Sequence, residues 1–261
     1  MEKELNKDNT KEEIQDKLNK KERKTSIEHR IFVLGMITAI AFIITAFAVN
    51  FMPDTVPMHY NMQGEIDRYG SKNENYLFPV MIALFNVFWI VMIAFYNRKV
   101  NKEADEKKKE EAKSNSKILY WAAIGTSVLF TGMQCIFLMM DVNSADSVKP
   151  VNFDMANMFI TVAMGILFIF LGNIMPKTKL NGLVGLRTTW SMANDTTWRL
   201  SNRFGGKAMI VCGVVTIFCG FFFKGVTSSY AMLAVLMIMV IVCVIYSYKV
   251  YQKYGKRDEN H

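Results

Sequence analysis

The chain has 261 residues, 51% of them hydrophobic and 21% charged, and its formal net charge is +8 at neutral pH. The charged residues are absent from long stretches of the chain, which is not the pattern of a soluble globular domain. The four cysteines all lie within these stretches and have no C-x-x-C spacing. They are therefore expected to be small packing residues, and not disulfide partners or metal ligands.

Six windows without any Lys, Arg, Asp or Glu predict six transmembrane helices. About 20 apolar residues, rising ~1.5 Å each, match a hydrocarbon core of about 30 Å. Continuous apolar runs favour helices over a barrel, whose strands alternate between apolar and polar residues. The windows are 31–52, 76–97, 118–140, 155–175, 208–223 and 225–248. The predicted fold class is an all-α membrane protein with a bundle of six transmembrane helices.

The first window is expected to remain in the protein as a span. Ala46-Phe47-Ala48 resembles a signal-peptidase site, but 30 residues of mixed charge precede an apolar run of 22 residues. A signal peptide has a short basic leader and an apolar region of about 7–15 residues.

Basic residues alternate between high and low counts in successive connecting segments, from the first to the last: nine, two, eight, one, six, one and four. By the positive-inside rule, the odd-numbered segments are cytoplasmic, and so are both termini. The net charge is thereby explained by topology, and no direct contact with nucleic acid is expected.

The chain is expected to divide into five parts. They are a charged cytoplasmic tail (1–30), two spans with an outer loop (31–97), a charged cytoplasmic linker (98–117), a four-span region (118–248) and a cytoplasmic tail (249–261). The first tail is either disordered or a solvated helix, and the linker is expected to continue the second span as a helix.

The segment before the fifth span predicts a short amphipathic inner-loop helix. Ser191 is its expected N-cap, and Gly205-Gly206 is its expected end. Trp190 and Trp198 would flank its apolar face, so the helix either lies along the cytoplasmic headgroups or packs on the bundle. Within the fifth span, Gly213, Thr216 and Gly220 form a stripe that predicts close helix packing.

Chemical motifs are scarce. The six windows hold no ionisable residue apart from Cys and Tyr, which disfavours a proton-coupled transporter or pump. No Walker A, H-E-x-x-H or G-x-S-x-G pattern occurs, so the enzyme classes that these motifs mark have no support. His59 with Asp54, Glu65 and Asp67 could hold a metal, but with one imidazole a hydrogen-bonded loop histidine is expected. Neither a metal nor a cofactor is predicted.

Two loops carry family patterns. The inner loop, within 172–207, has Gly172-Asn173-Ile174-Met175-Pro176-Lys177, Asn181, Gly185-Leu186-Arg187-Thr188-Thr189-Trp190, Trp198-Arg199 and Asn202-Arg203-Phe204-Gly205-Gly206-Lys207. It resembles the signature of the SdpI family of six-span bacterial immunity proteins, which commonly has proline where this chain has Thr189. The outer loop resembles the DUF1648 domain of the same proteins through Pro53, Asp54, Pro57, His59, Gly64, Asp67 and Gly70.

The resemblance implies a function at the bacterial plasma membrane. A member of the family protects a toxin-producing cell from its own secreted peptide and, with toxin bound, holds a winged-helix autorepressor at the membrane. It implies that the outer loops meet a peptide toxin and that the inner loop offers Arg187, Trp190, Trp198, Arg199 and Arg203 to a repressor. Membrane anchoring is the alternative role of these five side chains.

Two other functions stay open. A small-solute transporter or channel could use polar span residues as a path, namely Asn86, Thr126, Ser127, Gln134 and Thr161. A membrane enzyme using the acidic residues and His59 of the outer loop is the weaker alternative.

Overall fold

The computed structural model describes residues 27–61, 65–143 and 153–255. It contains six helices that are long and apolar enough to cross a membrane. They are the first helix (Ile27–Val49), α2 (Leu77–Lys102), α3 (Glu106–Asn143), α4 (Phe153–Ile174), α5 (Asp195–Phe222) and α6 (Val226–Tyr254). Each predicted window coincides with one helix, so the six-helix bundle is confirmed.

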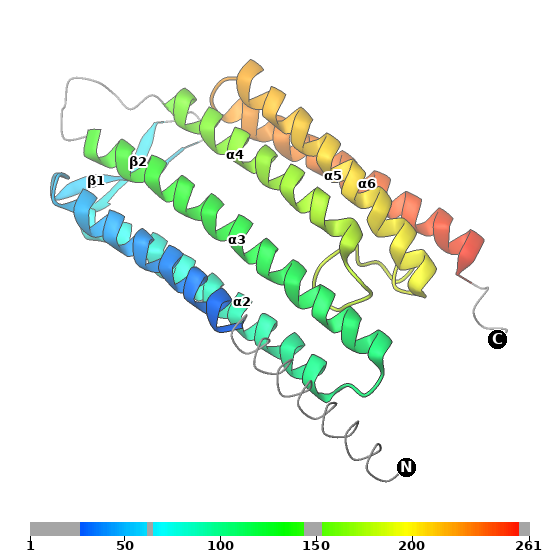
Figure 1. Cartoon of the computed structure of the whole chain (residues 1–261). Coiled ribbons are helices and arrows are strands. Elements are labelled where there is room, and N and C mark those ends of the chain that lie inside the picture. Colours follow the sequence, from blue (N-terminus) through cyan, green and yellow to red (C-terminus); the bar gives the residue numbers. More distant parts are fainter. Residues whose placement is uncertain (1–26, 62–64, 144–152, 256–261) are drawn as a thin grey trace, which may run out of the picture.

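The helices lie side by side in two groups (Figure 1). The first helix, α2 and α3 form one group. The second group consists of α4, α5 and α6, and α4 lies between α3 and the other two. At one end, here called the hairpin end, are the strands β1 (Thr55–Tyr60) and β2 (Ile66–Ser71), followed by the 3-10 helix η1 (Lys72–Tyr76). At the other end lie residues 178–194, here called the signature loop, which follows the 3-10 helix η2 (Met175–Lys177).

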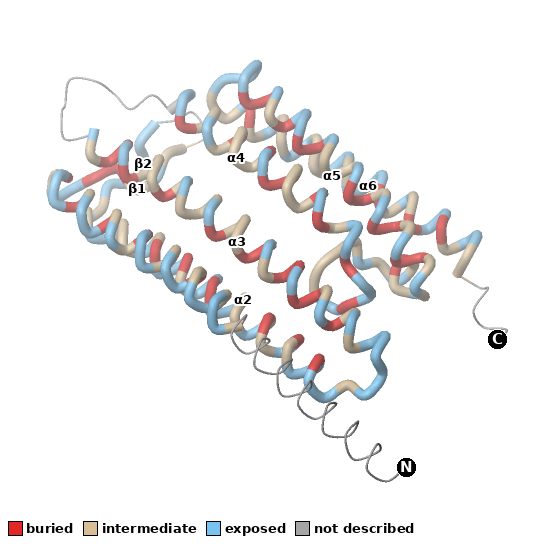
Figure 2. Tube along the Cα trace, in the orientation of Figure 1, coloured by how far each residue is buried: buried red, intermediate tan, exposed pale blue. Residues whose placement is uncertain are grey.

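Burial follows the helix faces that meet one another, whereas the outward faces are exposed and apolar (Figure 2). Phe47 and Met139 are two-thirds exposed, and Phe222 is 77% exposed. Large apolar side chains on an outer surface are stable when lipid, rather than water, covers them. The outer surface of the bundle is therefore suited to a bilayer.

Polar side chains join the first helix to α2 and α3. The amide of Asn86 donates to Thr38 Oγ1 over 2.9 Å, and its oxygen accepts from Ser127 over 2.6 Å. The amide of Gln134 donates to the carbonyl of Ala41 and to the hydroxyl of Thr45. Such bonds stabilise helix contacts in lipid by about 1 kcal/mol each. These residues therefore hold helices together, which does not favour the alternative of a solute path.

The other two residues considered for a path, Thr126 and Thr161, also have hydrogen-bond partners within the bundle. The Thr126 hydroxyl donates to the carbonyl of Ala122 on its own helix, and the hydroxyls of Thr161 and Ser228 lie 3.3 Å apart, joining α4 to α6.

Glycines let α4 and α5 approach closely. A methyl group added to Gly213 would lie 2.5 Å from the carbonyl oxygen of Gly165, and one added to Gly206 would lie 2.6 Å from that of Gly172. Because Gly206, Gly213 and Gly220 are seven residues apart, they recur on one face of α5. The close-packing role predicted for Gly213 and Gly220 is confirmed.

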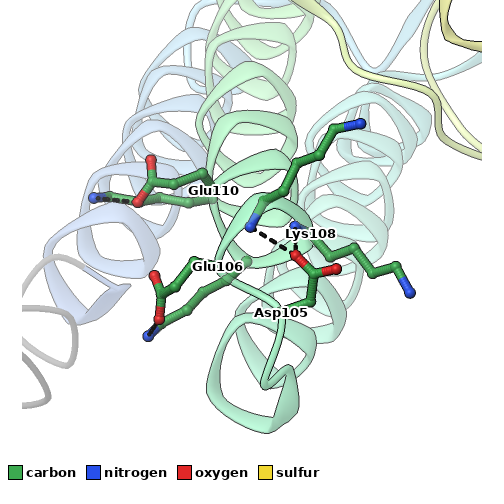
Figure 3. A network of polar contacts seen from close by, with 7 residues as sticks. Asp105, Glu106, Lys108 and Glu110 are labelled. Carbon is green, nitrogen blue, oxygen red and sulfur yellow. Dashed lines mark hydrogen bonds and ion pairs between the residues drawn. The ribbon is translucent and has the colours of Figure 1, made fainter.

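The charged linker differs from its prediction. Only its first part continues α2, which ends at Lys102, and most of it is the beginning of α3. Asp105 explains the new start, since its carboxylate accepts the backbone N–H groups of Lys107 over 2.8 Å and Lys108 over 3.3 Å (Figure 3). An ion pair between Glu106 and Lys109, 2.8 Å long, lies along the first turn.

The short amphipathic inner-loop helix was predicted wrongly. Asn194, rather than Ser191, is the N-cap, and the helix that begins at Asp195 continues through Gly205-Gly206 to Phe222 as α5. Two glycines did not end the helix because α4 packs against them, which stabilises the helical conformation that isolated glycines disfavour. The outer loop forms a β-hairpin within the otherwise helical fold.

Candidate functional site

The side chain of Asn181 organises the signature loop. Its oxygen accepts the backbone N–H groups of Leu183 over 2.7 Å and Val184 over 2.8 Å, and its amide donates to the carbonyls of Lys179 and Val184. A buried loop needs partners for its backbone polar groups, since unpaired ones are costly. Asn181 thus supplies bonds that a helix or sheet would otherwise provide.

The loop inserts into the bundle through two apolar side chains. Leu183 and Val184 pack against the buried cluster that includes Leu34, Ile93 and Leu119 from the first helix, α2 and α3. Irregular backbone at such depth is tolerated where protein surrounds it. The signature loop therefore connects the two groups of helices rather than lying outside them.

Trp198 and Asn202, on the first turns of α5, hold the signature loop in place through hydrogen bonds to its backbone. The indole N–H of Trp198 donates to the carbonyl of Thr178 over 2.9 Å, and the oxygen of Asn202 accepts from the backbone of Leu186 over 2.7 Å. Trp198 is only 2% exposed. Of the two placements left open for this segment, packing on the bundle is the one found for Trp198, whose side chain fills the space beneath the loop and is not exposed to a partner.

Gly185 lies where the loop passes over these two side chains. Its φ is +123°, which is unfavourable for other residues, and an added methyl group would overlap Asn202 Oδ1 and lie 3.0 Å from the Trp198 ring. A glycine is required at this position by conformation and by space.

Hydroxyl and amide groups attach the second half of the loop to α5 and α6. The Thr188 and Ser247 hydroxyls lie 2.5 Å apart, and the amide of Asn194 donates to the carbonyl of Tyr254 over 3.1 Å. Asn194 also accepts from the backbone of Thr197 as the helix cap. Sequence reasoning missed Asn194 and Asn202 as positioning residues, although Asn before a helix is a recognisable cap signal.

The exposed cations of this end form what is here called the signature basic surface. It consists of Lys177, Lys179, Arg187, Arg199, Arg203 and Lys207, all exposed. Trp190 is half-buried against Tyr248, with ring centroids 4.9 Å apart. Cationic side chains in such number favour acidic surfaces or phosphates.

The remaining signature residues lie beside α5. The amide of Asn173 is exposed and donates to the carbonyl of Ile169 over 3.1 Å. The ring of Pro176 faces Gly206, where an added methyl group would lie 2.7 Å from its Cγ. Both positions are therefore explained by packing and by local bonds.

The β-hairpin at the opposite end is antiparallel and pairs Thr55 with Ser71 and Pro57 with Tyr69. His59 Nδ1 lies 2.6 Å from Asp67 Oδ1, so the histidine is hydrogen-bonded within the loop as expected. At Gly70 an added methyl group would meet the Glu74 carboxylate. Gly64, a predicted signature position, lies outside the described residues.

An ion pair closes the open end of the hairpin. Asp54 Oδ1 lies 2.9 Å from Lys72 Nζ, and the hydrogen bond from Lys72 lowers the pKa of the Asp54 carboxyl. Because Asp54 is fully exposed, this pair contributes little to stability.

The hairpin is also attached to the helices beneath it. Val56 is fully buried and packs with Val49, Met52 and Leu138. The amide of Asn75 donates to Asp141 Oδ2, at the end of α3, over 2.8 Å. The hairpin therefore has a fixed position on the bundle, although most of its second strand is exposed.

Comparison with known proteins finds a matching family model for a segment at each end of the bundle. Residues 177–247, which include the signature loop, match the SdpI/YfhL protein family, and residues 36–83, which include the hairpin, match DUF1648, a domain of unknown function. The chain is 23% identical over 221 residues to "Immunity protein SdpI" of Bacillus subtilis (strain 168), covering 85% of this chain and 94% of that protein. No solved structure matches. The chain is therefore similar to the SdpI/YfhL family over residues 177–247 and to DUF1648 over residues 36–83, and it is a multi-pass protein of the bacterial plasma membrane.

Proposed function

We propose that this protein gives a bacterium resistance to a secreted, membrane-active peptide toxin. The observation that carries this proposal is the similarity to an immunity protein along 85% of the chain, which includes both the hairpin and the signature loop. The name of that relative denotes immunity and no catalysed reaction. We accordingly infer a protein without enzymatic activity.

The hairpin end is proposed to face outward and to meet the peptide. The basic residues are few in the segments of this end and many at the other, which by the positive-inside rule puts the hairpin outside. The exposed strand β2 and the acidic side chains Asp54, Glu65 and Asp67 offer backbone and charge to an incoming cationic peptide.

The signature basic surface is proposed to hold a cytoplasmic repressor of the winged-helix type, the partner that family resemblance implies. Arg187, Arg199 and Arg203 are exposed and would pair with acidic side chains, whereas Trp198 acts from below by holding the loop in place. Trp190 is half-buried, so part of its ring would remain available to the partner.

Resistance is tested by expression in a toxin-sensitive bacterium. The expected result is higher survival under a cognate peptide than in cells with an empty vector, at matched growth and with membrane insertion verified. Equal killing across a panel of candidate peptides, despite verified insertion, contradicts the proposal. Genes for a small secreted peptide and a repressor beside this gene would identify the peptide and the partner to use.

Repressor recruitment is tested by the fraction of a tagged repressor that sediments with membranes. Arg187→Ala and Trp190→Ala are expected to insert normally and to lower that fraction. Lys113→Ala is the matched control, since Lys113 is exposed at the same end but lies on α3, outside the signature basic surface. Unchanged recruitment in both variants removes the repressor from the proposal while leaving resistance intact.

A further inference from the structure

A cavity of about 280 Å³ lies at the signature-loop end, between the end of α2, the beginning of α3 and the signature loop. Tyr96 and Lys99 line it from α2, Lys108 and Glu111 from α3, and Gly182 from the loop. The backbone of Gly182 hydrogen-bonds the Tyr96 hydroxyl, which attaches the loop to α2 at the wall of the cavity. Three segments that are far apart in the sequence therefore build one site.

The charges of this cavity favour an anion. Lys99 and Lys108 are exposed, and within the described part of the chain neither ammonium group belongs to an ion pair. Glu111 is the acidic residue of the lining, so two cations face one carboxylate. Arg187 interacts electrostatically with Tyr96 and adds positive potential at the same place. An anionic ligand would thus gain two unpaired cations on entry.

The cavity lies at the depth of lipid headgroups. The charge-free window of α2 ends at residue 97, next to Tyr96, and that of α3 begins at residue 118. At ~1.5 Å per residue, Asn115 lies about 4.5 Å and Lys108 about 15 Å beyond that boundary along α3. The headgroup layer is about 5–8 Å thick on each side of the hydrocarbon core. The lining therefore begins at the hydrocarbon boundary, crosses this layer and ends at Lys108 on its aqueous side.

We propose that the cavity binds the phosphate of an anionic glycerophospholipid. Lys99 and Lys108 contact the phosphate, as lysines do in basic pockets between transmembrane helices. At about 30 Å³ per water, the space holds about nine waters, which suits a phosphodiester with its glycerol but not the acyl chains. Leu180, which is 39% exposed at the cavity, would contact the beginning of those chains. Glu111 would accept a hydrogen bond from a headgroup hydroxyl.

The test is native mass spectrometry of the full-length protein in detergent, titrated with phosphatidylglycerol and, separately, with phosphatidylcholine. One variant is Lys99→Gln with Lys108→Gln. A second is Gly182→Glu, which adds a carboxylate where a methyl group meets nothing within 4 Å, so the fold has room for it. The matched control is Lys102→Gln with Lys117→Gln, which removes exposed lysines of the same two helices that do not line the cavity.

The expected result is one tightly bound phosphatidylglycerol in preference to phosphatidylcholine. A lysine near an anionic lipid contributes about fivefold to binding, so the double variant should bind about 25-fold more weakly, and Gly182→Glu should also weaken binding. The control should bind as the parent protein does. Equal weakening in the control, or no preference for phosphatidylglycerol, overturns the proposal. Binding of soluble glycerol phosphate with equal affinity overturns the lipid assignment in favour of a soluble phosphate ester.

Discussion

Replacing Gly213 with alanine tests whether α4 and α5 depend on direct backbone contact. The added methyl group would lie 2.5 Å from the Gly165 carbonyl oxygen and 2.8 Å from Ile169 Cγ1. Ordinary contact begins at 3.4 Å, so the helices would have to separate by about 0.9 Å, and the buried backbone oxygen cannot turn aside. Overpacking of this kind costs about 1–3 kcal/mol.

The matched control is Gly132→Ala on α3, where a methyl group meets nothing within 4 Å. Both substitutions gain the same helix propensity, up to ~1 kcal/mol, and lower the entropy of the unfolded chain alike. The difference between them therefore isolates the contact between α4 and α5. We expect Gly213→Ala to be less stable than Gly132→Ala by about 1–3 kcal/mol.

The assay is the midpoint of SDS-induced unfolding of each purified variant, followed by helical circular dichroism from mixed micelles. Gly132→Ala should unfold at the same SDS fraction as the parent protein or a higher one, and Gly213→Ala at a lower one. Free energies for the two variants that agree within about 0.5 kcal/mol, the usual size of a neutral surface change, would refute the packing argument.

Three further predictions concern the two ends of the bundle. Asn181→Ala should destabilise the signature loop by about 1–3 kcal/mol, because buried backbone groups lose their hydrogen-bond partners. The measurement is amide hydrogen exchange, which should become faster in residues 178–192; exchange at the rates of the parent protein would contradict the prediction. Lys72 lowers the pKa of the Asp54 carboxyl, so the stability that their ion pair contributes is fully present above the unfolded-state pKa and is lost as the pH falls through the folded-state pKa. An NMR titration should find a higher Asp54 pKa in Lys72→Gln than in the parent protein. In intact cells, and with the native cysteines replaced, Arg203→Cys should react only with a membrane-permeant thiol reagent, because Arg203 is proposed to face the cytoplasm. Asp67→Cys should react with an impermeant reagent as well, because the hairpin is proposed to face outward; the opposite pattern removes the basis for a repressor docking at Arg203.

The six spans could be predicted from sequence because exclusion of charge from lipid acts on each segment separately. The close-packing stripe at Gly213 and Gly220 could also be predicted, since small residues at helical spacing in a membrane helix usually mark a face that packs against another helix. Their partners on α4, Gly165 for Gly213 and Val162 for Gly220, could not, because the sequence does not say which helix packs against which.

The signature loop shows where local reasoning fails. The sequence left open whether Trp198 lies at the membrane interface, where tryptophan is common, or packs on the bundle; it lies under the loop and donates a hydrogen bond to the carbonyl of Thr178. The burial of a side chain on an amphipathic segment depends on what folds back over it, and here the loop does so through Gly185 and Asn202. Asp105 likewise moved the boundary between α2 and α3 through a local cap that charge counting overlooked.

The sequence by itself determined that the chain enters a membrane, how many times it crosses, and which segments connect the crossings, because transfer of each segment into lipid depends on its own composition. Only the tertiary structure decided that Asn181, Trp198 and Asn202 position a loop while Arg187, Arg199 and Arg203 remain exposed, and that Lys99 and Lys108 share a cavity with Gly182. Those relations join residues from different helices, and contact between distant segments is fixed by packing of the whole bundle rather than by the composition of any one part.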